Sequence, residues 1–173
     1  MINNVSDIVK FLKLKNNREN VYFVPAFTGL GAPDWRPDAR GLITGLTRNS
    51  DWKSLIRATI ESVAYQPSDL FESMTRDGLR PSSIKIDGGM ASNNWFTQFL
   101  SNILKIKITR SKINETTALG AAYIAGYQIG IFKSLEHIKK KWKKDRDFMP
   151  KFNKSQRNKL LQGWKQAIRK TLT

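Results

Sequence analysis

The segment IKIDGGMASNN, from Ile84 to Asn94, joins a short apolar strand to an amphipathic helix through two successive glycines. Gly88 and Gly89 have no Cβ, so the main chain can turn sharply there and a ligand can lie directly against it. Beyond this turn, apolar residues recur at helical spacing, at Phe96, Phe99, Leu100, Ile103 and Leu104. A strand, a turn and a helix in this order are typical of an α/β domain, in which ligands bind at the carboxyl ends of strands.

The residues that follow the two glycines suit an anionic ligand or a nucleoside. The first turn of a helix leaves N–H groups without partners inside the helix, and such groups attract anions. Asn93 and Asn94 stand where the helix is expected to begin, and a side-chain amide can hydrogen-bond a base or a ribose. The motif alone leaves two interpretations open, a ligand site and a simple connection between strand and helix.

Two strands are expected before this turn, at Val21 to Phe27 and at Leu42 to Leu46, with Pro25 favouring a short or edge strand. The loop between them contains TGLGAPDW, Thr28 to Trp35, which has neither the G-x-x-x-x-G-K-[ST] spacing nor the lysine of a phosphate-binding loop. We interpret it as a structured loop. In it, Gly29 and Gly31 adopt special backbone angles and Trp35 is anchored in a hydrophobic pocket.

A long helix is expected after Ser50 or Asp51, either of which can cap it, with Gly78 beyond its end. Pro67 lies inside this helix. Proline removes one backbone donor and costs about 3 kcal/mol in a regular helix interior. The sequence therefore predicts a kink or a break near Ala64.

After the glycine turn, the pattern predicts one strand at Ile106 to Arg110 and three helices. The helices are expected at Ala118 to Gly130, at Leu135 to Lys144 and from about Ser155. Thr116 or Thr117 is expected to cap the first of these helices. Its many small residues allow another backbone to approach it closely. The alternation of strands and helices after an opening pair of strands indicates an α/β fold.

The composition of the 173 residues excludes several kinds of site. There is no cysteine, which rules out a disulfide, a thiolate nucleophile and a Cys-ligated metal. His137 is the single histidine, so a Ser-His-Asp triad or a multi-histidine metal centre is disfavoured. Because no apolar run approaches the roughly 18 residues of a membrane span, and the N-terminus does not read as a secretory signal, we expect a cytoplasmic protein with no membrane partner.

The acids best placed for acid/base chemistry or for Mg²⁺ are Asp34, Asp38, Glu61 and Asp87. No two of them form a recognisable catalytic pair, and Glu61 has Arg57 four residues before it as an alternative ion-pair partner. The sequence therefore assigns no catalytic and no metal-ligating residue.

The net charge of +16 is concentrated near the C-terminus, where residues 133–173 carry 14 Lys and Arg against 3 acids. The run KKKWKKDRD, Lys139 to Asp147, could bind a nucleic acid. The competing interpretation is a solvated helix face. We favour it because lysines outnumber arginines, Trp142 is the only aromatic residue within the run, and charge runs are usually solvated. A basic nucleic-acid-binding module stays an alternative.

Four segments, taken together, resemble the carboxyl-terminal domain of the glycerol kinases within the FGGY family of carbohydrate kinases. They are VYFVPAFTGLGAPDW with PDARG, GLITGLTRNSDWKSLIRATIESVAYQ, IDGGMASNNWFTQFLSNIL and ETTALGAAYIAGYQIG. Gly41 to Glu61 is similar to the second signature of the family, although Ser54 and Pro67 depart from the usual pattern. The wording PAFTGLGAP favours glycerol kinases over the sugar kinases, and a kinase of another polyol or sugar is the alternative.

The resemblance implies an α/β fold similar to actin, hexokinase and the Hsp70 ATPase, of the ribonuclease H-like type, present as its carboxyl-terminal half without the first hairpin. It implies ATP and Mg²⁺ as cofactors and phosphorylation of glycerol to glycerol 3-phosphate by a homo-oligomer. The residues that match nucleotide contacts of the family are Gly89 and Asn93, with Gly88 shaping the turn. The implied organisation is a lead-in at 1–20, a nucleotide-binding domain at 21–132 and basic helices at 133–173 packed on that domain.

In the family, the catalytic base, the glycerol contacts and the carboxylates around Mg²⁺ come from an amino-terminal domain that does not match any segment of this sequence. Phosphoryl transfer depends on positioning and electrostatics. Holding the reactants in line is worth about 7–11 kcal/mol. The hypothesis from the sequence is therefore a kinase fragment that is inactive alone.

Overall fold

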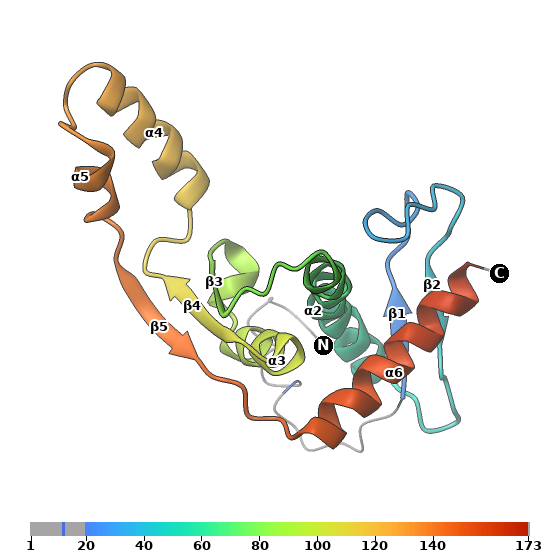
Figure 1. Cartoon of the computed structure of the whole chain (residues 1–173). Helices are drawn as coiled ribbons and strands as arrows, with labels where there is room; N and C mark the ends of the chain where they lie inside the picture. Colours follow the sequence, from blue (N-terminus) through green and yellow to red (C-terminus); the bar gives the residue numbers. More distant parts are fainter. Residues whose placement is uncertain (1–11, 13–19, 173) are drawn as a thin grey trace.

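The computed structural model of the chain describes Leu12 and residues 20–172 (Figure 1). Most of the lead-in expected at 1–20 lies outside the described residues. The elements in chain order are β1 (Tyr22–Val24), β2 (Leu42–Thr44), α2 (Trp52–Arg76), β3 (Ser83–Ile86), a 3₁₀ turn (Gly89–Ser92), α3 (Asn94–Leu104), β4 (Lys107–Ser111), α4 (Thr116–Gln128), α5 (Leu135–Lys139), β5 (Lys144–Phe148) and α6 (Lys154–Thr171).

The strands form two small sheets. β1 and β2 are antiparallel, with Phe23 opposite Ile43. In the second sheet the order is β3-β4-β5, with β3 parallel to β4 and β5 antiparallel to it. The β3-α3-β4 unit places the glycine turn at the carboxyl end of β3, as the sequence predicted. Within this sheet β3 is an edge strand, so one side of its backbone is not paired with another described strand.

The core lies where α2, α3 and α6 meet (Figure 1). Tyr65 of α2 stacks on Trp164 of α6 with ring centroids 5.2 Å apart, and it meets the edge of Phe99 from α3 at 5.7 Å. Tyr65, Phe99 and Trp164 are all buried. Aromatic pairs in these arrangements stabilise a core beyond their burial of apolar area. This cluster fixes α3, and therefore the glycine turn at its N-terminal end, against the rest of the molecule.

Helix α2 confirms one expectation and corrects another. Asp51 caps it as predicted, since its carboxylate accepts hydrogen bonds from the backbone N–H groups of Lys53 and Ser54 at 2.9 and 3.0 Å. The helix then continues from Trp52 to Arg76 through Pro67, so of the predicted kink or break near Ala64 the break is wrong, while the kink stays a prediction. Packing of the buried residues on both sides of Pro67 outweighs the loss of one backbone hydrogen bond.

The basic run near the C-terminus is not the single helix that was predicted for Leu135 to Lys144. Helix α5 ends at Lys139, and residues Lys144–Phe148 form β5, paired with β4. Asp147 binds the hydroxyl of Thr109 at 2.7 Å across this pair. Trp142, the only aromatic residue within the run, lies against Lys85 Nζ, which is 4.1 Å from its ring centroid. Much of the run therefore makes contacts within the fold.

Helix α4 and helix α5 project away from the core (Figure 1). Gly126 is the only buried residue of α4, although the helix is largely apolar. Exposed hydrophobic side chains continue into α5, and they are Ile124, Tyr127, Ile129, Ile131 and Leu135. Within residues 20–172, no helix combines the length and the apolar character that crossing a lipid bilayer requires.

One half-buried carboxyl makes the stability of the fold depend on pH. Asp69 of α2 accepts a hydrogen bond from Trp164 Nε1 at 2.6 Å. Burial raises the pKa of Asp69 from an ordinary value of 3.8 to about 6, although this hydrogen bond lowers it in part. A pKa that is higher in the folded state means that the unfolded chain releases its proton first, so stability falls as the pH rises through this interval.

We therefore expect Asp69→Asn to be more stable than the parent above pH 6, and equally stable below pH 4. The asparagine oxygen can still accept the indole hydrogen bond, while the cost of ionising a half-buried carboxyl disappears. The gain is about 1–2 kcal/mol, allowing for solvent screening. Urea unfolding of both proteins across this pH range measures it. A pH-independent difference between them would contradict the assignment.

Candidate functional site

The glycine turn leaves the carboxyl end of β3 and reaches α3 through a 3₁₀ turn. Gly88 has φ +85°, a backbone conformation that residues other than glycine rarely adopt. Gly89 opens the 3₁₀ turn, and its carbonyl accepts a hydrogen bond from Ser92 Oγ at 2.6 Å. A Cβ at either glycine would meet no described atom within 4 Å. Packing inside the chain therefore does not require glycine at position 89, and the space beside it is open to a ligand.

Asn93 has a structural role that the sequence reasoning missed. The sequence predicts a helix that begins near Asn93 and Asn94, and this is confirmed, since α3 begins at Asn94 with Asn93 as its N-cap. The Asn93 Oδ1 accepts hydrogen bonds from the backbone N–H groups of Trp95 and Phe96 at 3.0 and 3.2 Å. These two N–H groups are therefore not available to an anion, contrary to the expectation from the sequence.

The other half of the Asn93 amide is a donor. None of the described residues accepts a hydrogen bond from its Nδ2. An amide whose oxygen is held by two backbone N–H groups has a fixed plane, so the direction of this donor is fixed as well. Asn93 and the two glycines are thus brought together around one open turn, and the remaining donor is suited to a base or a ribose.

Arg110 of β4 holds this turn in place, and no sequence motif indicated it. Its Nη1 donates to the carbonyl oxygens of Ala91 and Ser92 at 2.8 and 3.1 Å and to Asn94 Oδ1 at 2.9 Å. Its Nε and Nη2 bind the carboxylate of Asp145, each at 2.7 Å. The Arg110 side chain is only 12% exposed. One guanidinium therefore ties the 3₁₀ turn to the sheet.

We expect Arg110→Ala to destabilise the fold by about 1.5–3 kcal/mol, because hydrogen bonds to a charged group are lost and carbonyl groups lose their donor. Arg146→Ala is a matched control, since Arg146 is exposed on the neighbouring strand and also lies near the Phe148 ring. Thermal unfolding of the two variants measures the difference. Equal midpoints would show that Arg110 does not fix the turn.

Asp87 connects the end of β3 with the start of α4. Its Oδ2 accepts hydrogen bonds from the backbone N–H of Thr116 at 3.2 Å and from the Thr116 hydroxyl. The residue before the helix is Glu115, which makes no side-chain cap bond, so the predicted cap at Thr116 or Thr117 is wrong. In this structure Asp87 takes the role of the cap from a distant strand.

The other acids singled out in the sequence lie apart from the turn. Asp38 forms a bidentate ion pair with Arg36, and these hydrogen bonds lower the pKa of Asp38 to about 2. Glu61 is buried in α2 and accepts a hydrogen bond from the Tyr65 hydroxyl at 3.1 Å. Among the described residues no three or more histidine, cysteine or acidic side chains gather as metal ligands would.

The structure of the loop Thr28 to Trp35 differs in two respects from what we predicted from the sequence. Gly29 has a positive φ of 95°, as expected, but Gly31 does not. Trp35 is 73% exposed rather than anchored in a hydrophobic pocket.

Comparison with known proteins identifies the family. The pattern of the FGGY family of carbohydrate kinases, C-terminal domain, matches residues 9–129. Glycerol kinase of Gluconobacter oxydans is 54% identical over 154 residues, 88% of this chain and 30% of the relative. Glycerol kinase of Coxiella burnetii is 48% identical over 153 residues, again 88% of this chain and 30% of the relative. This chain thus spans about a third of the length of the curated relatives that it matches.

Solved structures agree with the family. The crystal structure of Plasmodium falciparum glycerol kinase with ADP is similar with a TM-score of 0.85 and 38% identity, covering 99% of this chain and 35% of that one. Xylulose kinase from Lactobacillus acidophilus shares the fold with a TM-score of 0.75 at 22% identity, over 95% of this chain and 33% of that one. The fold is therefore that of these kinases, as expected. The chain belongs to the FGGY family of carbohydrate kinases, and it corresponds to their C-terminal domain.

Proposed function

We propose that this chain is the nucleotide-binding part of a glycerol kinase, which transfers the γ-phosphoryl group of ATP to a terminal hydroxyl of glycerol. The observation that carries the proposal is the open glycine turn with the fixed Asn93 amide beside it. The identity with glycerol kinases of about half the aligned residues supports it. The similar Plasmodium falciparum enzyme was crystallised with ADP.

In this proposal the nucleotide lies against the main chain at Gly89, where no side chain intervenes. Gly88 supplies the positive φ that the turn needs, and the Asn93 Nδ2 donates a hydrogen bond to the nucleoside. During transfer, a bond forms between the glycerol oxygen and the γ-phosphorus, and the bond from that phosphorus to the bridging oxygen of ADP breaks. The hydroxyl proton goes to a base that we do not assign to this chain.

The described residues do not suit a magnesium ion, because no carboxylate cluster lies beside the turn. Asp87, the nearest of the acids, is engaged by Thr116. We therefore assign no magnesium ligand here and derive no step from the metal. The proposal places the Mg²⁺ ligands and the glycerol contacts in the parts of a kinase that this chain does not match. A homo-oligomer in the cytoplasm is part of the same proposal.

The exposed apolar side chains of the projecting arm, residues 116–139 with α4 and α5, support the need for such a complement. Ile124 is 59% exposed and Ile131 is 65% exposed on the projecting arm. One edge of β3 also has no described strand beside it. A strand edge and an apolar helix face that are both open favour association with further polypeptide. The occupant that we propose is the remaining part of a glycerol kinase.

Two fusions test the choice between glycerol kinase and sugar kinase. In the first, this chain replaces the matching third of the Gluconobacter oxydans glycerol kinase, and in the second, that of the Lactobacillus acidophilus xylulose kinase. We expect glycerol-dependent ADP release from the first fusion and no xylulose-dependent release from the second, since surfaces that are 22% identical do not fit one another as well. Activity of the second fusion alone would favour the sugar kinase.

A further inference from the structure

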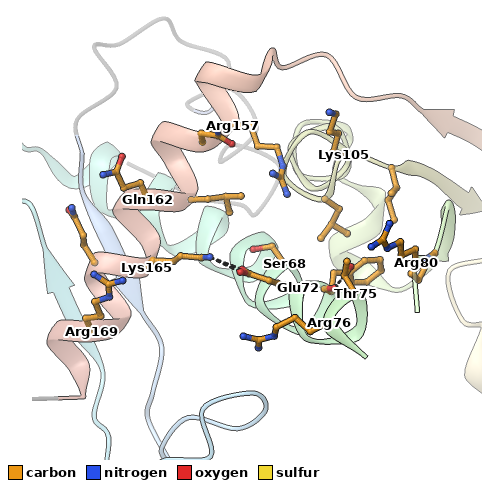
Figure 2. A pocket seen from close by; sticks show the side chains of 17 residues that line it. Ser68, Glu72, Thr75, Arg76, Arg80, Lys105, Arg157, Gln162, Lys165 and Arg169 are labelled. Carbon is orange, nitrogen blue, oxygen red and sulfur yellow. Dashed lines mark hydrogen bonds and ion pairs between the residues drawn. The ribbon is translucent and has the colours of Figure 1, made fainter. Parts of the chain in front are cut away.

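A basic cavity of about 1130 Å³ lies between α2, α3 and α6, and the proposed function does not use it (Figure 2). Its lining includes six cationic side chains, Arg76, Arg80, Lys105, Arg157, Lys165 and Arg169. The lining contains one acid, Glu72, and this carboxylate pairs with Lys165 at 2.7 Å. Five positive charges therefore face the cavity in excess of the negative charge that lines it.

The charges come from separate elements that the fold brings together. Arg157, Lys165 and Arg169 lie on one face of α6, and at a rise of about 1.5 Å per residue they span about 18 Å. Arg80 and Lys105 lie on the opposite side of the cavity, on the segments that follow α2 and α3 (Figure 2). The cations thus form two walls rather than a single exposed helix face.

Several of these cations are not neutralised within the described residues. Arg80 and Lys105 form no ion pair there. The half-buried Arg157 donates through Nε to the carbonyl oxygen of Ile103 at 2.6 Å and forms no ion pair with a described carboxylate, although the charge of Glu72 acts on it. Arg76, Lys165 and Arg169 also line a smaller adjoining pocket that contains Asp34 and Asp69. The uncompensated charge is therefore greatest on the wall formed by Arg80, Lys105 and Arg157.

We propose that this cavity binds an anion that carries a chain of two or more phosphate groups. A chain of phosphates offers more anionic oxygens than a single phosphate does, so it can bind guanidinium and ammonium groups of both walls at once. Leu104, Ile106 and Leu161 provide apolar surface for an organic substituent. The volume of about 1130 Å³ is slightly larger than the roughly 300–1,000 Å³ that is usual for small-molecule sites. The chain of phosphates can be free or part of a nucleoside polyphosphate.

The cavity is distinct from the glycine turn. It is lined by the C-terminal end of α3, while Asn93 caps the N-terminal end of the same helix. The 11 residues of α3 separate the two ends by about 16 Å. Failure of one site therefore does not imply failure of the other.

Isothermal titration of the 173-residue chain with tripolyphosphate at about 150 mM salt, where weak surface attraction is screened, tests the proposal. The variant R80Q/K105Q/R169Q removes three positive charges, two from the wall that holds Arg80 and Lys105 and one from α6. We expect binding at one site per chain and at least about tenfold weaker binding in this variant. The control K112Q/K141Q/K143Q removes three exposed charges that do not line the cavity, and we expect its affinity to stay within about twofold.

Two further arms separate the sources of the anion and guard against misfolding. Binding of ATP is compared with binding of tripolyphosphate in the Asn93→Ser variant. Tighter binding of ATP would identify the ligand of the cavity as a nucleoside polyphosphate. Tighter binding of tripolyphosphate would identify it as free polyphosphate. In the unmodified chain, tripolyphosphate is expected to slow acetylation of Lys105 but not of Lys141. The proposal is overturned if no binding occurs, if both triple variants lose affinity equally, or if Lys105 is not protected.

Discussion

Mixed with the part of the Gluconobacter oxydans glycerol kinase that it does not match, this chain is expected to phosphorylate glycerol at least about 10⁵ times faster than it does alone. Phosphoryl transfer requires the donor and the acceptor to be held in line, and oriented reactants gain an effective concentration of this order. The described residues supply the proposed nucleotide-binding turn but no acceptor site that we can identify. ADP release by the two polypeptides, separately and together, measures the effect.

The exposed apolar arm provides the control for this complementation. Ile124→Asp with Ile131→Asp should abolish the activity of the mixture, because burial of each isoleucine in the joint surface is worth about 1.5–3 kcal/mol. Gln128→Asp adds a charge to the same helix at an exposed polar position and should leave most of the activity. Full activity of the isolated chain, or of the isoleucine variant, would contradict the need for a complement.

The second large effect is expected at Asn93. In the fusion of this chain with the rest of the Gluconobacter oxydans glycerol kinase, the joined enzyme, Asn93→Ala should weaken ADP binding by about 1–3 kcal/mol. This is roughly 5- to 150-fold, since the donor to the nucleoside is lost. This variant also loses the cap of α3, which costs about 0.5–2 kcal/mol of stability. A change in binding could therefore arise from the helix rather than from the ligand contact.

Asn93→Ser separates these two causes. Serine is a good N-cap, so its hydroxyl can accept the hydrogen bonds from Trp95 and Phe96 while the amide donor is absent. We expect Asn93→Ser to retain thermal stability and still to bind ADP as weakly as Asn93→Ala does, measured by titration calorimetry. Parental affinity in Asn93→Ser would show that Asn93 acts only as a helix cap.

The sequence predicted those parts of the fold that depend on neighbouring residues. Asp51 could be predicted to cap α2 because its carboxylate stands two residues before Lys53 and three before Ser54, whose N–H groups it binds. The strand, glycine turn and helix at Ile84 to Asn94 follow from a short-range pattern of apolar and glycine residues. The same local pattern indicated both glycines and both asparagines, and the family resemblance then selected Gly89 and Asn93 with Gly88 shaping the turn; the structure brings these three residues together around an open turn.

The remainder depends on contacts between distant residues. β5 was missed because its pairing with β4 joins residues such as Thr109 and Asp147 that are far apart in the sequence, whereas its charges alone are typical of a solvated helix. Arg110 was missed because two of its partners are backbone carbonyl oxygens, at Ala91 and Ser92, which no side-chain pattern reveals. Helix α2 passes through Pro67 because Ala64, Tyr65 and Ser68 are buried around it.

A crystal structure of the joined enzyme with ADP bears on the nucleotide site itself. We expect the nucleoside to lie against the main chain of Gly89 and to accept a hydrogen bond of about 3 Å from Asn93 Nδ2. Density for ADP elsewhere, with Gly89 and Asn93 in contact only with water, would contradict the nucleotide site on which the proposed function rests.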